Sequence, residues 1–241
     1  MVADNALPER IQYFYTFQFA NGVEQRFEVS LNAATLELAP NASAPKPEWT
    51  KLTYHQCEQC PLADTVTHCP IAVNLSSLVE RFKDSLSFEN TTVTVQTHQR
   101  TYAKQTSLQQ GLSSIIGLYM VTSGCPVMDP LRPNVRFHLP FASSEETIYR
   151  AVSMYLMAQY FRMRRGEAPD WTLDHLAEVY KGVWRVNKGI TQRLAQASSK
   201  DANVNAVIVL SMFGSNLDDY LEDSLKEIEP LFSDRTKPAQ P

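Results

Sequence analysis

Apolar and polar positions alternate along residues 11–29. Large apolar side chains occupy the odd positions from 11 to 19, and most even positions there are polar. A period of two predicts a β-strand with one buried face. The pair Asn21-Gly22, followed by a second alternating run over 23–29, predicts a tight hairpin. We expect a short third strand over 35–39.

Spacings of three and four between apolar residues replace this alternation further along. They predict a helix that begins at Pro70, directly after a cysteine, since proline is favoured at the first helical position. A strand is expected over 91–97. A second helix should follow Ser107, which forms a candidate capping box with Gln110, and should end at Gly124.

The C-terminal half is predicted to be helical. Ser143 and Glu146 form another candidate capping box, and 148–161 is apolar on most sides, so we expect a central core helix there. After Pro169, apolar residues recur in steps of three and four over 173–197. This apolar stripe predicts a long helix packed along one side.

Three residues on or beside that stripe call for an explanation. Asn187 is its polar interruption, and Gly182 and Gly189 flank it. A glycine inside a helix costs about 1 kcal/mol relative to alanine, so we expect a neighbouring element to approach closely at both glycines. Two further amphipathic helices are predicted over 204–213 and 217–228.

Together these elements predict an α+β protein. It would have an N-terminal antiparallel hairpin or small sheet, a cysteine-rich segment and a mainly helical C-terminal half. We expect a single domain over residues 1–232 and a disordered tail over 233–241. The alternative is a division into 1–100, with the sheet and the cysteine-rich segment, and 101–232, with the helices.

Composition excludes several classes of function. The chain has 241 residues and 22 Lys plus Arg against 26 Asp plus Glu, a net charge of −4, so we expect no nucleic-acid partner. Its 8 glycines form neither a dinucleotide fingerprint nor a phosphate-binding loop. No apolar run has the roughly 20 residues of a membrane span, and the first ten residues lack a secretory pattern. A soluble, cytoplasmic protein is expected.

The candidate chemistry lies in the cysteines, Cys57, Cys60, Cys69 and Cys125, which are all that the chain has. Two residues separate the first pair, the third follows closely, and the fold must bring in the fourth. Four thiolates suit either a closed tetrahedral Zn²⁺ site or a [4Fe-4S] cluster. In a reducing compartment a shared metal site is expected rather than disulfides.

The flanking residues support both metals. His55 and His68 beside the cysteines are side chains that zinc accepts as substitute ligands, whereas Pro61, Pro70 and Pro126 each follow a cysteine, as a proline does in bacterial ferredoxins. The cysteine spacing matches neither ferredoxin pattern, so zinc is the first expectation and a cluster the second.

Two other interpretations of the cysteines stay open. They could be buried thiols that only pack the core. One could instead be reactive, in which case Cys69 is favoured: it precedes a predicted helix N-terminus, which would lower its pKa, whereas Cys125 follows a helix C-terminus, which would raise it.

A second candidate site involves Arg136 and His138. Bracketed by Pro133 and Pro140, residues 136–140 are expected to be extended, which would place both side chains on one face as a possible anion-binding site. The alternative is a half-buried segment whose histidine bonds the backbone.

Several motifs resemble those of an uncharacterised bacterial protein family. They are CEQCPL (57–62), HCPIAVN (68–74), SGCP (123–126), RFHLPFAS (136–143) and YLMAQYF (155–161). The resemblance implies no activity. The sequence thus predicts a protein with a structural four-cysteine site, with zinc as the expected metal, acting as an interaction or regulatory module toward a protein partner. The alternatives are an iron–sulfur redox protein or enzyme, and an enzyme or binder of a small anionic ligand through Arg136 and His138. The oligomeric state stays open.

Overall fold

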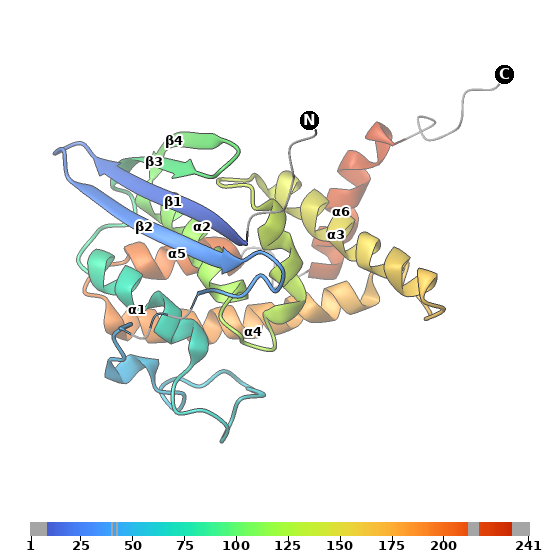
Figure 1. Cartoon of the computed structure of the whole chain (residues 1–241), viewed down its shortest axis with the longest axis horizontal. Helices are drawn as coiled ribbons and strands as arrows, with labels where there is room; N and C mark the ends of the chain where they lie inside the picture. The colour runs from blue at the N-terminus through green and yellow to red at the C-terminus, as the bar shows by residue number, and fades with distance from the viewer. Residues whose placement is uncertain (1–8, 40, 42, 212–216, 233–241) are drawn as a thin grey trace.

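A computed structural model describes residues 9–39, 41, 43–211 and 217–232. In these ranges the strands form one four-stranded antiparallel sheet in the order β2-β1-β3-β4, and the helices lie to one side of it (Figure 1). The strands are β1 (Arg10–Phe19), β2 (Glu24–Asn32), β3 (Asn90–Gln96) and β4 (Thr101–Ser107). The predicted hairpin is confirmed, and so is the strand expected over 91–97, which is β3. Gly22 adopts the positive φ of 82° that the hairpin turn requires.

The sheet differs from the prediction at two places. β4 was not expected, because its residues are mostly polar and exposed and carry little alternation. The strand expected over 35–39 is absent from the described part of the chain, where a single bridge joins Leu38 to Leu31.

One face of the sheet forms the core. Tyr15 and Phe17 are fully buried and lie opposite Val95 and Val93 of β3. A Cβ added to Gly111 of helix α2 (Leu108–Val121) would lie 2.7 Å from Val93 Cγ2, so the helix backbone packs directly on the sheet. The tyrosines and phenylalanines of β1 therefore anchor α2 over the sheet centre.

The helices occur close to where the apolar spacing predicts them. They are α1 (Pro70–Phe82), α2 (Leu108–Val121), α3 (Ser144–Arg164), α4 (Asp174–Ala197), α5 (Ala202–Ser211) and α6 (Leu217–Ile228), with short 3₁₀ helices η1 (Glu48–Thr50), η2 (Asp129–Phe137) and η3 (Glu229–Leu231). α5 packs against both α2 and α4. No helix in the described ranges is both long and apolar enough to cross a lipid bilayer.

Only one of the two predicted capping boxes forms. Ser143 Oγ accepts a hydrogen bond from Glu146 N at 3.1 Å, and Glu146 Oε2 accepts one from Ser143 N at 2.8 Å. Ser107 makes no side-chain cap bond to the residues that the structure describes, so the prediction there is wrong. The reason is that Ser107 is also the last residue of β4, which runs directly into α2.

The expectation of a central core helix over 148–161 is also wrong. α3 buries only a narrow face that includes Ile148 and Val152, and these residues form a small cluster with Leu176 of α4. Met157 and Phe161 are more than half exposed. Figure 1 shows the reason: the C-terminal part of α3 projects away from the sheet and the other helices.

The main core is continuous from β1 to α5 and includes Cys69 and Cys125. The core therefore contains residues from both sides of residue 100, the boundary in the alternative division into 1–100 and 101–232. The tail expected to be disordered, 233–241, lies outside the described residues.

Candidate metal centre

All four cysteines line one small pocket of about 60 Å³. Cys57 and Cys60 lie in the loop between η1 and α1, where Cys60 N donates to Cys57 O at 3.2 Å in a tight turn. Cys69 directly precedes the first residue of α1, and Cys125 follows the end of α2. Three separate stretches of chain thus deliver the four thiols to one place, and all four are free.

Helix α4 forms one wall of this pocket, and two of its glycines lie close to the segments that carry the cysteines. A Cβ added to Gly189 would lie 2.7 Å from Cys57 Sγ, and one added to Gly182 would lie 3.0 Å from Val127 Cγ1. The two glycines are two helical turns apart and face the same side. The close approach expected at both is confirmed: they admit the loops that carry Cys57 and Cys125.

A buried arginine adjoins the thiols. Arg193 of α4 also lines the pocket and has no exposed surface. Its guanidinium donates to the carbonyl oxygens of Trp49 at 2.8 Å, Lys51 at 2.6 Å and Leu52 at 2.8 Å. Within the described residues its Nε has no hydrogen-bond partner and no carboxylate pairs with it. Arg185 and the exposed Glu58 are the other charged residues at the pocket wall, so the site carries a net positive charge.

Burial dominates the acidity of the thiols. It raises the pKa of Cys57 to about 12, with a further contribution from the neighbouring Cys69, while Arg193 acts in the opposite direction. Burial likewise raises the pKa of Cys69 and of Cys125. Without a metal these three thiols are protonated at neutral pH.

The expectation of a lowered Cys69 pKa is wrong. The backbone N–H groups of Ala72 and Ile71 at the start of α1 do lower it, as a helix N-terminus should. The desolvation of a thiol packed in the core outweighs them. Cys125 shifts in the expected direction, but because of burial rather than the end of α2.

The two neighbouring histidines do not line the pocket as the structure describes it. His68 Nδ1 lies 2.9 Å from Thr50 Oγ1, and His55 stacks edge-on against Tyr54. The side chains at the pocket that could ligate a metal are therefore the four cysteines and Glu58. Among the described residues no three His, Cys, Asp or Glu side chains are placed so that they could hold a metal ion.

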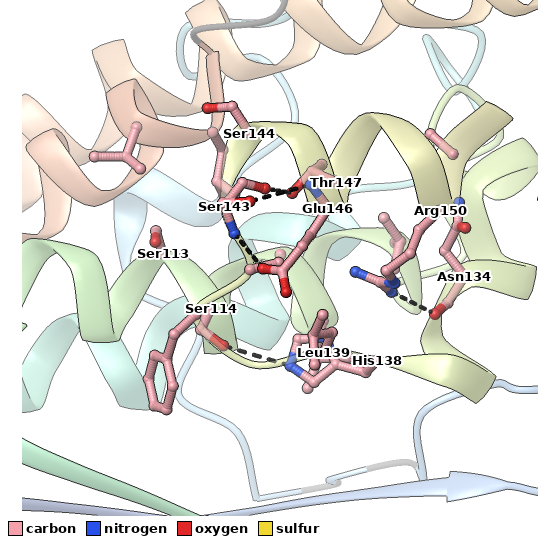
Figure 2. Close-up of a pocket in the computed structure, with 18 of the residues that line it drawn as sticks. Ser113, Ser114, Asn134, His138, Leu139, Ser143, Ser144, Glu146, Thr147 and Arg150 are labelled. Carbon is pink, nitrogen blue, oxygen red and sulfur yellow. Dashed lines mark hydrogen bonds between the residues drawn. The ribbon is translucent and has the colours of Figure 1, made fainter. Parts of the chain in front are cut away.

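Arg136 and His138 do not form the expected pair on an extended segment. Residues 129–137 form the 3₁₀ helix η2, which Asp129 and Pro130 begin and His138 ends. His138 lines a second, larger pocket, whereas Arg136 is not among the described residues at its wall (Figure 2). The histidine ring lies 2.7 Å from the Tyr15 hydroxyl rather than bonding the backbone.

Sequence reasoning missed two arginines, the buried Arg193 at the thiol pocket and the half-buried Arg150 at the larger one. A signal for the first was present: it lies between Ile190 and Leu194 of the apolar stripe, where a charged residue is out of place. Arg150 precedes the buried Ala151 and Val152 and had no such marker.

A family model described as "Domain of unknown function (DUF6901)" matches residues 13–233. The chain belongs to this family. The match agrees with the resemblance to an uncharacterised family, and it spans the four cysteines and both arginines. No curated protein and no solved structure shows significant similarity to the chain. The family description names no activity.

Proposed function

We propose that this protein binds a metal through the thiolates of Cys57, Cys60, Cys69 and Cys125. One observation carries the proposal: every cysteine of the chain, including Cys125 from a distant part of the sequence, borders the same small pocket. Thiols that served only to pack a core would not need to gather in this way.

The buried charge of Arg193 supports an anionic centre. Four thiolates around a divalent ion carry a net charge of about −2. A guanidinium without exposed surface, bonded only to neutral carbonyls, is unfavourable unless a negative charge lies close to it. Metal-bound thiolates at the pocket would supply that charge, and the protonated thiols of the metal-free protein would not.

Zinc is the first candidate. Four sulfur ligands close its coordination shell and leave no position for water, so such a site would stabilise the fold rather than catalyse a reaction. It would tie the loop of Cys57 and Cys60 to the ends of α1 and α2. The protein would then act as an interaction or regulatory module.

A [4Fe-4S] cluster is the second candidate, because cysteine thiolates are also its usual ligands. The prolines after Cys60, Cys69 and Cys125 favour it, since a proline follows a ligand cysteine in bacterial ferredoxins.

The test is metal analysis with a visible spectrum on protein purified without air. About one zinc per chain and no colour would support the structural zinc site. About four iron with sulfide and a brown colour would support the cluster. Folded protein without either metal would overturn the proposal.

Two variants assign the ligands. Cys60→Ser should lose the metal, whereas His68→Gln should keep it, because His68 bonds Thr50 outside the pocket. Equal metal content in the two variants would contradict the four-cysteine site.

A further inference from the structure

The second pocket has the size of a small-molecule site. Its volume is about 710 Å³, within the usual range of 300–1,000 Å³. It lies between α2, the start of α3 and the loop that joins η2 to α3 (Figure 2). In the described part of the chain it shares no lining residue with the thiol pocket, so it is independent of the proposed metal centre.

Arg150 brings an unpaired cation to this pocket. Its Nη2 donates to Asn134 O at 3.0 Å, and Figure 2 shows its side chain reaching from α3 toward the segment of His138. Within the described ranges Arg150 Nε is buried without a hydrogen-bond partner, and no carboxylate forms an ion pair with the guanidinium. Its planar fork is suited to hold a carboxylate with two parallel hydrogen bonds.

His138 supplies a neutral donor beside this cation. Burial, with a contribution from Arg150, lowers its pKa to about 3, so the ring is uncharged at neutral pH. Burial raises the pKa of Tyr15, which therefore remains a phenol. We assign the 2.7 Å contact as Tyr15 donating to His138 Nε2. The ring proton then resides on Nδ1, which is left to donate to a ligand.

The remaining charges limit the ligand to a single negative charge. Besides the neutral histidine and the half-buried Tyr180, the ionisable side chains at the wall are Lys104, Glu146 and Arg150, an excess of one positive charge. Glu146 is held in place by the capping box with Ser143. A dianion such as phosphate would place its second charge near that carboxylate without a matching cation.

Most of the other wall residues are apolar. They include Leu118, Val121, Val135, Leu139, Val209 and Leu210. Such a surface favours an apolar body on the ligand, because burying it removes apolar area from water.

We infer that this pocket binds a small monocarboxylate with an apolar body, its carboxylate held by Arg150 and by the N–H of His138. The anion-binding role expected for Arg136 thus falls to a residue on α3, whereas His138 keeps the role. An apolar acid of about the size of octanoate is a suitable probe.

The test compares octanoate with 1-octanol by isothermal titration calorimetry on the full chain. We expect octanoate to bind about tenfold or more tightly than 1-octanol, because only the carboxylate forms charge-assisted hydrogen bonds with Arg150. This comparison requires no variant. Equal binding of the alcohol, no binding of octanoate, or tighter binding of inorganic phosphate would overturn the inference.

Two variants of α3 locate the contact. Arg150→Met should weaken octanoate binding about tenfold or more, and Arg164→Met, which removes an exposed arginine from the same helix, should leave it unchanged. Circular dichroism checks that both are folded. Equal affinity in the two folded variants would place the carboxylate elsewhere and overturn the inference.

Discussion

Removing the buried Arg193 side chain would leave three backbone carbonyls without their hydrogen-bond donor. The backbone carbonyls of residues 49, 51 and 52 accept hydrogen bonds from its guanidinium. These residues directly precede the loop of Cys57 and Cys60. We expect Arg193→Met to lower the free energy of unfolding by about 3–5 kcal/mol, because it leaves these carbonyl oxygens without a hydrogen-bond donor. It should also lower metal retention. Chemical denaturation and metal analysis measure both effects.

The control is Lys188→Met, which removes an exposed cation from the same helix. We expect it to change stability by less than about 1 kcal/mol, since it loses only a surface contact with the Trp184 ring. If the two variants were equally stable, the buried guanidinium would not hold the loop.

His138 predicts a pH dependence with a defined sign. Its pKa is lowered to about 3 in the folded protein, against about 6.5 in an unfolded chain. Between these values the unfolded state binds a proton that the folded state does not, so stability rises with pH. The contribution is fully present above about pH 6.5 and is lost as pH falls toward 3.

We therefore expect wild type to lose about 1–2 kcal/mol more stability than His138→Gln between pH 7 and pH 5. Urea denaturation at both pH values measures the difference. His98→Gln, at an exposed position, should follow wild type. Parallel pH profiles for wild type and His138→Gln would contradict the burial of this ring as a neutral group.

At the scale of elements, the approach of α4 to the thiol loop depends on a missing side chain. Ordinary helix propensity predicts that Gly189→Ala stabilises by up to about 1 kcal/mol. The structure predicts the opposite, because the new Cβ would lie 2.7 Å from Cys57 Sγ. We expect a loss of about 1–3 kcal/mol and weaker metal retention.

Gly117→Ala in α2 is the matched control. Its added Cβ would lie 3.7 Å from Leu210 Cδ2, an ordinary contact, so this variant should be neutral or more stable. Thermal denaturation with metal analysis compares the two. A stabilised Gly189→Ala that keeps its metal would show that the loop does not rest on the glycine.

The elements that the sequence predicts correctly are those whose pattern is local. The β1–β2 hairpin, α1 and α4 were predicted because their periodicity and turn residues are local. β4 has no such pattern, and the exposure of α3 depends on which elements lie beside it, which its own apolar residues do not reveal. The close approach at Gly189 was predictable because a glycine inside a helix is costly. The sequence did not indicate that Cys57 is the residue that approaches it.

At the scale of the whole molecule, the candidate sites combine residues that are distant in sequence. Counting thiols indicated that Cys125 should join Cys57, Cys60 and Cys69, and the structure places all four at one pocket. No comparable rule brings Arg193 to those thiols or Arg150 to His138. Their positions follow from helix packing, which decides whether a long cationic side chain points to water or into the core.

The last prediction concerns cooperativity. The main core crosses residue 100 and includes Cys69 and Cys125, and α4 contacts the thiol loop through Gly189. A metal held by all four thiols would connect these parts, and it stabilises only the folded state. We expect one thermal transition in calorimetry, shifted to lower temperature as a whole when the metal is removed by a chelator. Two transitions, with a sheet-containing part that melts independently of the metal, would contradict this coupling and favour the division into 1–100 and 101–232.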